Sequence, residues 1–182
     1  MIRLKTPLKG EEILKLNVGD NVLLSGTIFT ARDKAHVFLL ENDFDKVKDS
    51  VIYHCGPIIK DGKAVAAGPT TSSRMNPHTP KMIEKYGVKA IIGKGGMDNS
   101  VLGALKGKAI YFSALGGAAV IYAKAISVKG VDKEEFGMPE AIWEFEVKDF
   151  PVVVAMDAKG NSLYEKIYGE SEKVFRKLIG QA

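Results

Sequence analysis

The chain of 182 residues contains a single cysteine, Cys55. One cysteine excludes an intramolecular disulfide framework, and it cannot by itself hold a metal cluster that needs several thiolates. The first residues lack the apolar core of a secretory signal peptide. No run of the chain approaches the about 20 apolar residues that span a bilayer. These absences predict a soluble, cytoplasmic protein without a membrane partner.

An excess of charge of one sign is also lacking. The 26 basic and 22 acidic residues are interleaved and leave a formal net charge of +4. No basic tail and no basic stripe spaced with aromatic residues is present, so a nucleic-acid partner is not expected. A few cationic side chains that attract a small anion into one pocket suit this charge balance better.

The composition is that of an ordinary globular protein, with 46% hydrophobic and 26% charged residues. Its length predicts one domain over residues 1–182. Strands are predicted at 22–30, 51–55, 64–67, 88–92, 109–114 and 151–156, and an alternating segment at 142–147. Helices are predicted at 37–43, 81–86, 98–106, 120–128 and 171–179. Strands interleaved with helices and hairpins predict a single α/β domain with a mixed sheet.

The most informative stretch runs from Gly68 to Met75 and reads Gly-Pro-Thr-Thr-Ser-Ser-Arg-Met. The Gly-Pro pair breaks the preceding strand, and hydroxyl residues after a turn are good N-caps of a helix. A helix N-terminus with a nearby guanidinium would bind a carboxylate or phosphate. The stretch therefore indicates an anion site that includes Thr70, Thr71 and Arg74. An ordinary capped turn with a solvated arginine remains the alternative.

Two more polar clusters follow predicted strands. Arg32 comes directly after residues 22–30, and Lys94 lies in the run Gly-Lys-Gly-Gly-Met. This run is not a Walker A motif, because Gly95 stands where a serine or threonine would bind magnesium. The alternatives are a surface ion pair of Arg32 with Asp33 or Asp43, and a solvated Lys94. If the strand ends converge, two arginines, a lysine and several hydroxyls would line one pocket suited to a dicarboxylate.

The catalytic apparatus is incomplete in the sequence, which shows no paired acid and base, no activated nucleophile and no metal-ligand constellation. His36 is interpreted as a hydrogen-bonding residue of its helix, because no other ligand lies at metal-binding spacing. Glu140 either orients a basic residue or, as the preferred reading, is a solvated carboxylate. No role is assigned to Cys55.

Three ordered motifs resemble a known family. They are Ala-Arg-Asp-Lys-Ala-His at 31–36, Ala-Gly-Pro-Thr-Thr-Ser-Ser-Arg-Met at 67–75, and Gly-Lys-Gly-Gly-Met at 93–97. Together they resemble the β subunit of iron–sulfur hydro-lyases, the class I fumarases and L-tartrate dehydratases. The resemblance runs nearly end to end, and in one-chain class I fumarases the same unit is the C-terminal domain. Ser73 departs slightly from the family pattern, which commonly has glycine or alanine there.

The resemblance implies a swivelling β/β/α fold and a role as part of a heteromeric enzyme that is inactive alone. An α subunit would be the partner and would hold a [4Fe–4S] cluster with three of its own cysteines, so this chain would ligate no metal. The expected assembly is an α2β2 heterotetramer.

For the site, the resemblance implies that Arg32, Arg74 and Lys94 hold a C4 dicarboxylate. Thr70 and Thr71 would hydrogen-bond the substrate, with Thr70 close to the reacting carbon as a candidate catalytic residue. The expected reaction is reversible hydration of fumarate to L-malate, a step of the tricarboxylic acid cycle. Dehydration of L-tartrate to oxaloacetate is the alternative within the family. A stand-alone module that binds a small anion without catalysis is the alternative outside it.

Overall fold

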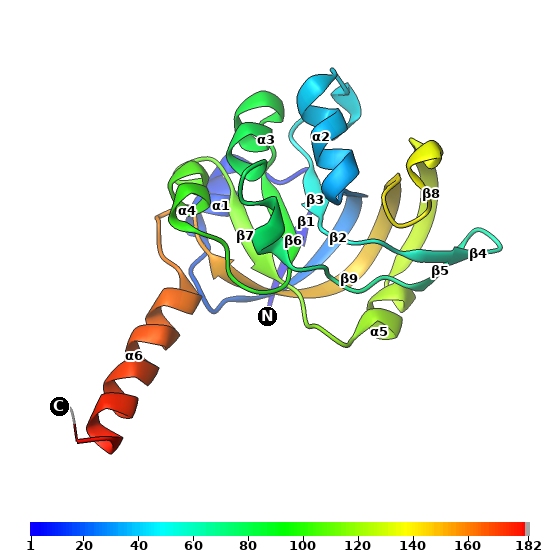
Figure 1. Cartoon of the computed structure of the whole chain (residues 1–182). Helices are drawn as coiled ribbons and strands as arrows, with labels where there is room; N and C mark the ends of the chain where they lie inside the picture. The colour runs from blue at the N-terminus through cyan, green and yellow to red at the C-terminus, as the bar shows by residue number, and fades with distance from the viewer. Residues whose placement is uncertain (181–182) are drawn as a thin grey trace.

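The computed structural model describes residues 1–180, which form nine strands, six α-helices and three short 3-10 helices (Figure 1). The strands are β1 (Ile2–Lys5), β2 (Asn21–Thr30), β3 (Val51–Tyr53), β4 (Ile58–Lys60), β5 (Lys63–Ala66), β6 (Ala90–Gly93), β7 (Ile110–Ser113), β8 (Ile126–Asp132) and β9 (Ile142–Met156). The helices are α1 (Gly10–Lys15), α2 (Asp33–Glu41), α3 (Thr79–Tyr86), α4 (Asn99–Leu105), α5 (Ala119–Lys124) and α6 (Leu163–Leu178). The 3-10 helices are η1 (Asp45–Val47), η2 (Ser72–Met75) and η3 (Glu134–Phe136).

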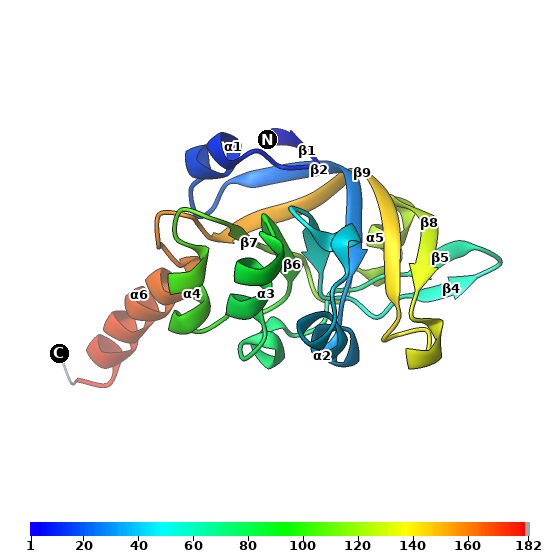
Figure 2. The ribbon, with the colours of Figure 1, turned by 90° about the horizontal axis from the view of Figure 1, so that it is seen from above.

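Seven strands form one mixed sheet in the order β1-β2-β3-β6-β7-β9-β8. The strands from β1 to β7 in this order run parallel to their neighbours. The long strand β9 runs antiparallel to β7 and also to β2, so the strands between them close into a small barrel. Figure 2 shows β9 curving across the molecule from β7 toward β8. The predicted α/β domain with a mixed sheet, the swivelling fold implied by the resemblance, is therefore confirmed.

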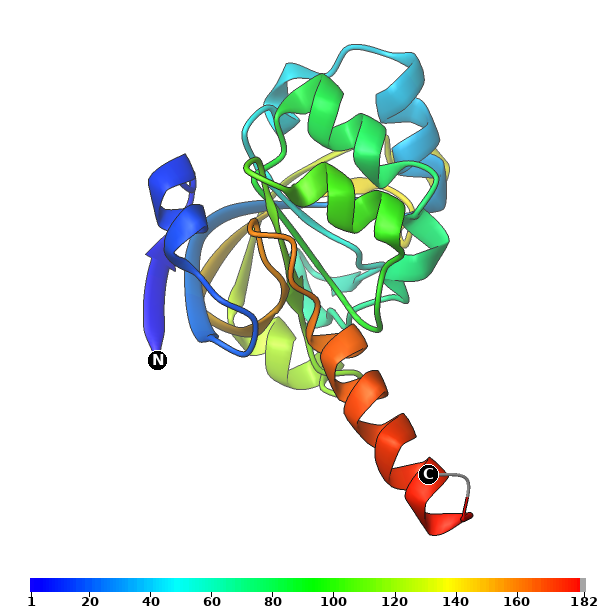
Figure 3. The same cartoon turned by 90° about the vertical axis from the view of Figure 1, so that its left-hand side faces the viewer.

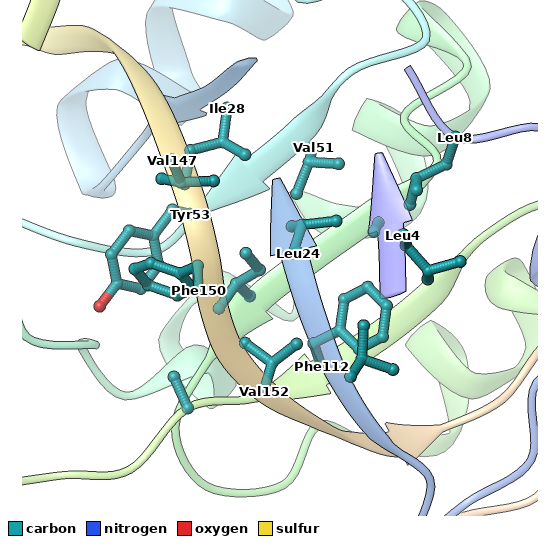
Figure 4. Packing of buried hydrophobic residues seen from close by; sticks show 14 of the residues in the cluster. Leu4, Leu8, Leu24, Ile28, Val51, Tyr53, Phe112, Val147, Phe150 and Val152 are labelled. Carbon is teal, nitrogen blue, oxygen red and sulfur yellow. The ribbon is translucent and has the colours of Figure 1, made fainter. Parts of the chain in front are cut away.

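The buried apolar residues lie on the two faces of this sheet. One cluster fills the barrel and includes Leu24, Phe112 and Phe150, each fully buried (Figure 4). The second cluster lies under α2, α3 and α4, which pack side by side along one side of the sheet (Figure 2). A sheet covered on both faces needs nearly continuous apolar strands, as the sequence of β6 shows.

Local chemistry explains several helices and turns. Pro80 stands in the first turn of α3, and Gly87 ends this helix with a left-handed φ of 63°. Asp98 caps α4 by accepting hydrogen bonds from the backbone N–H groups of Ser100 and Val101. Asp61 and Gly62, both with positive φ, turn the chain between β4 and β5. Helices α3 and α4 confirm the helices predicted at 81–86 and 98–106.

The predicted helix over 120–128 is wrong in its second half. Helix α5 ends at Lys124, and β8 begins at Ile126 and pairs antiparallel with β9. Apolar and polar residues alternate from Ile126 to Lys129, the period of a strand, and pairing with β9 uses that pattern.

The two segments predicted at 142–147 and 151–156 are one strand, β9. Asp149 has a positive φ of 50°, and its backbone N–H donates to Ser25 Oγ at 3.0 Å. The register between β2 and β9 shifts at Leu24 and Gly26. A register shift of this kind is a β-bulge, which bends the strand locally and increases its twist.

Helix α6 extends away from the domain and begins earlier than the predicted helix at 171–179 (Figures 1 and 3). No residue of α6 is buried. No helix within residues 1–180 is long and apolar enough to cross a membrane.

Candidate functional site

The parallel strands of the barrel bring three predicted polar segments to one edge. Arg32 follows β2, His54 follows β3 and Lys94 follows β6, and these three strands are parallel neighbours. The carboxyl ends of parallel strands share one edge of a sheet, which is where α/β folds place their ligands. The expected convergence of strand ends therefore has a basis in the topology.

The loop that carries Thr70 and Thr71 lies directly along Lys94. Thr71 and Lys94 form a parallel β-bridge. The backbone N–H of Lys94 donates to Thr70 O at 3.2 Å, and that of Ser72 donates to Lys94 O at 3.0 Å. Hydrogen bonds on both sides of Lys94 thus hold the two segments at a fixed distance.

Arg74 connects this loop to the start of α2. Its Nη2 donates to Thr70 Oγ1 at 2.8 Å and lies 3.2 Å from Asp33 Oδ2. The side chain of Arg74 is 44% exposed, so the guanidinium remains accessible to a ligand. Because Asp33 follows Arg32 in the chain, the ion pair places Arg74 and the Arg32 segment next to each other.

Arg32 pairs with Glu140 rather than with Asp33 or Asp43, the partners considered from the sequence. Arg32 Nε lies 3.3 Å from Glu140 Oε1, and the other carboxylate oxygen accepts a hydrogen bond from the Lys34 backbone N–H at 3.0 Å. The Glu140 side chain is only 17% exposed. The preferred reading of Glu140 as a solvated carboxylate is therefore wrong, since it orients the base of α2 and Arg32.

The predicted helix cap in this stretch is also wrong. Thr71 precedes η2, a single 3-10 turn, and its side chain makes no capping hydrogen bond. A single 3-10 turn offers little of the dipole of a longer helix. The contribution that a helix dipole would make to anion binding at this loop is therefore small.

Ser72 is buried under the loop and holds it to the sheet. The distance between Ser72 Oγ and His54 Nδ1 is 2.9 Å, and both residues are fully buried. Gly93, at the end of β6, leaves the space in which the Ser72 hydroxyl lies. Tyr111 on β7 donates to Gly95 O at 2.8 Å and anchors the glycine segment after Lys94. The two loops of the candidate site thus share a hydrogen-bonded base.

A row of three histidines extends from this base. His36 lies 5.1 Å from His54 and 5.9 Å from His78 between ring centroids. His36 Nδ1 lies 2.8 Å from Arg32 O, so it donates to that carbonyl, as expected of a hydrogen-bonding residue of its helix. Burial lowers the pKa of His36 to about 4 and also lowers the pKa of His54. Both rings are therefore neutral near pH 7.

Sequence reasoning named Glu140 as a possible orienting residue and Asp33 as a possible ion-pair partner, but it did not find which arginine each one contacts. Asp33 and Glu140, the partners of the two arginines, and the buried pair of Ser72 and His54 follow no local pattern. The sequence places His54 inside the strand predicted at 51–55, whereas β3 ends at Tyr53 and leaves His54 at the strand end, where functional polar residues concentrate.

Two sizeable cavities lie beside the candidate site rather than in it. Cavities of about 530 and 480 Å³ lie along α2 and are lined by Val37, Glu41 and His78 among others, but by none of the five predicted site residues. Within residues 1–180 no group of three histidine, cysteine or acidic side chains is placed to hold a metal. The arrangement can bind an anion, and it needs another surface to exclude water from it.

The chain matches the family model described as Fumarase C-terminus over residues 1–167. It is 46% identical to a candidate class I fumarate hydratase of Geobacillus stearothermophilus over 92% of this chain, and it spans only 34% of that relative's length. It is 44% identical to a candidate L(+)-tartrate dehydratase subunit beta of Methanocaldococcus jannaschii, over 94% of this chain and 93% of the relative. It is 38% identical to the L(+)-tartrate dehydratase subunit beta of Escherichia coli K12, over 94% of this chain and 89% of the relative.

These matches confirm the resemblance noted in the three sequence motifs. The alignments extend over most of the chain, so they include the strand ends that carry Arg32, Thr70 and Lys94. The chain therefore belongs to the fumarase C-terminus family, whose members include β subunits of hydro-lyases.

Proposed function

We propose that this chain is the substrate-binding β part of a two-part hydro-lyase that hydrates fumarate to L-malate. The observation that carries the proposal is the pairing of the Thr70–Arg74 loop with Lys94, together with the contact of Arg74 with Asp33 beside Arg32. Two guanidinium groups and one ammonium group suit the two carboxylates of a C4 dicarboxylate.

The proposed roles follow from the contacts of each side chain. Arg32, Arg74 and Lys94 bind and orient the carboxylates, which limits the motion of the reactant and lowers the barrier. Thr70 Oγ1 accepts a hydrogen bond from Arg74, so its own O–H proton is available to donate to the substrate. We assign Thr70 to the position nearest the reacting carbon and Thr71 to a second hydrogen bond.

The residues of this chain do not fit an iron–sulfur cluster. Its only cysteine, Cys55, is fully buried, and burial raises the pKa of its thiol to about 12. Thiolates are the ligands of such clusters. The proposal therefore places a [4Fe–4S] cluster and the main acid and base groups on an α subunit, with this chain covering the substrate.

An exposed apolar surface beside the candidate site supports this partner. Leu115, Val120 and Ile121 are 69%, 61% and 64% exposed. Their segment is tied to both substrate loops, because Ala114 N–H donates to Gly93 O at 2.7 Å and Ala67 N–H donates to Ala119 O at 3.0 Å. A subunit that covers these side chains would lie next to Lys94 and Thr70. An α2β2 heterotetramer is the proposed assembly.

Tartrate dehydration is a second candidate, favoured by the alignment lengths. This chain spans 93% and 89% of two relatives named as tartrate dehydratase β subunits, and only 34% of the fumarate hydratase relative. Fumarate, malate and tartrate are all C4 dicarboxylates that the same three cations would bind, so their hydroxyl groups must be distinguished elsewhere.

The decisive experiment is anaerobic reconstitution with the α subunit, assayed on fumarate, L-malate and both tartrate enantiomers. The highest kcat/KM is expected for fumarate and malate, and a preference for L-tartrate would select the second candidate. No turnover of any C4 dicarboxylate by an assembled, cluster-loaded complex would overturn the proposal. If the isolated chain bound dicarboxylates under that outcome, the stand-alone anion-binding module would be the better reading.

A further inference from the structure

Beyond its first turn, where Tyr164 packs on the domain and its hydroxyl lies 3.1 Å from Ser113 Oγ, the apolar face of α6 has no partner within the described chain. The helix is 16 residues long and contains no buried residue. Four of its large apolar side chains, Ile167, Val174, Phe175 and Leu178, are 52%, 59%, 59% and 80% exposed. Contiguous exposed apolar surface of this kind marks an interaction site. The family match ends at residue 167, so most of α6 lies beyond the part matched by the family model.

The apolar face is symmetric about its midpoint, Ser171. At about 100° per residue, the side chains within about 60° of Ser171 are Ile167, Tyr168, Val174, Phe175 and Leu178, together with Tyr164, which packs on the domain. The first four stand three or four positions before and after Ser171. A helix that packs antiparallel on a copy of itself requires this symmetry, because a twofold axis pairs each residue before the midpoint with one after it.

The charges of α6 are divided between its two halves. The half before Ser171 carries Glu165 and Glu170 with Lys166, a net charge of −1, and the half after it carries Lys173, Arg176 and Lys177 with Glu172, a net charge of +2. Parallel pairing of two copies would bring like charges together. Antiparallel pairing brings the acidic half of each helix beside the basic half of the other, which is electrostatically favourable.

We propose that α6 pairs antiparallel with α6 of a second copy of this chain, around a twofold axis at Ser171. Ile167 of each copy then packs near Phe175 of the other, and Tyr168 near Val174. The helix is about 24 Å long and projects from the domain (Figure 3), so a second helix can reach its apolar face beyond the first turn. This interaction is separate from the proposed substrate site and does not depend on it.

The pair is expected to be weak on its own. A stable interface buries about 800 Å² of accessible surface on each partner, and a contact of four helical turns buries less than this. The isolated full chain should therefore show a monomer–dimer equilibrium in the micromolar range by sedimentation. Phe175→Glu should weaken the dimer at least about tenfold, because it places a charge in the apolar contact.

Gly169→Glu is the matched control, since it adds the same charge on the opposite face, where a side chain meets open space. It should leave the dimer unchanged. A wild-type chain that remains monomeric across the micromolar range, or equal effects of the two variants, would overturn the proposal. The apolar face of α6 would then be interpreted as a binding surface for a different protein.

Disulfide trapping tests the orientation. Ser171→Cys should form a linked dimer under mild oxidation, because a residue on the twofold axis lies beside its own copy. The native Cys55 is buried and does not compete. Leu178→Cys lies on the same apolar face of α6 but about 10 Å along the helix from the midpoint. In the antiparallel pair the two cysteines at position 178 are therefore too far apart to form a disulfide. Efficient linking through residue 178 would indicate parallel pairing and contradict the proposal.

Discussion

The hydroxyl group of Ser72 lies in the space that a side chain at position 93 would need, where it would overlap the Cβ atom. Ser72 belongs to the loop that carries Thr70 and Arg74, whereas Gly93 is the last residue of β6 and precedes Lys94. This contact sets how closely the two loops of the candidate site approach each other.

Gly93→Ala should therefore disturb the contact between the Ser72 loop and the end of β6, which lies beneath the candidate site. The added methyl group overlaps Ser72 Oγ and separates the loop from Lys94, and overpacking of this kind costs about 1–3 kcal/mol of stability. Denaturant unfolding should show the loss, and dicarboxylate binding should weaken as well. Gly103→Ala is the control, because a methyl group there meets nothing within 4 Å. Ser72→Gly in the Gly93→Ala background should restore part of both properties, and no recovery would contradict this mechanism.

Arg74→Lys should lower kcat/KM of the reconstituted enzyme by about 10- to 100-fold, since a charged hydrogen bond contributes about 1.5–3 kcal/mol. Lysine keeps the charge but lacks the planar fork that binds Thr70 and a carboxylate together. The control Arg176→Lys, on exposed α6, should have wild-type activity. Near wild-type turnover by Arg74→Lys would contradict the proposed clamp.

Stability should fall in mild acid because of the buried histidines. Burial lowers the pKa of His36 from 6.5 to about 4 in the folded state, so the unfolded chain binds a proton first as the pH falls. The free energy of unfolding is therefore unaffected by the titration of His36 above about pH 6.5. Between pH 6.5 and about 4 it falls by about 1.4 kcal/mol per pH unit because of this one group. His36→Asn keeps a donor to Arg32 O and should flatten this slope in denaturant titrations, whereas His78→Asn should retain it.

Cys55 should be inert in the folded protein. Its side chain is fully buried, and burial raises the pKa of the thiol to about 12, so very little reactive thiolate forms at neutral pH. A thiol reagent should modify the native chain only at the rate of unfolding. Labelling as fast as that of a free thiol in native buffer would show that the barrel opens locally at β3.

Val120→Glu should prevent assembly with the α subunit without unfolding the domain. Val120 is 61% exposed beside the substrate loops, so a charge is harmless in the free chain but costly once a partner covers it. Co-purification and the thermal midpoint of the free chain separate the two effects. Leu14→Glu on α1, 47% exposed, is the control and should assemble normally. Wild-type assembly by Val120→Glu would remove α5 from the proposed interface.

Elements with strong local chemistry could be predicted from the sequence. The start and end of α3 follow from Pro80 and Gly87, and the turn at Asp61 from residues that tolerate positive φ. The second half of the segment 120–128 could not, because the alternation from Ile126 to Lys129 is too short to reveal that β9 will pair with it. Closure of the barrel likewise depends on contacts between β2 and β9, far apart in the chain.

In the candidate site too, some features follow from the local sequence and others depend on contacts between distant residues. Arg32, Thr70, Thr71, Arg74 and Lys94 could be named from motifs and strand ends, and their roles stay predictions. The pairing of Arg32 with Glu140 and of His54 with Ser72 depends on tertiary packing. No spacing rule in the sequence connects residues that meet only after the sheet has formed.

The pairing of β2 with β9 has a consequence for synthesis of the chain. Phe29 pairs with Glu144, so more than half of the chain separates the two strands that close the barrel. During translation β2 leaves the ribosome long before β9 is made, and its unpaired edge stays exposed in the meantime. We expect the nascent chain to remain vulnerable to aggregation and to depend on chaperones until β9 has emerged.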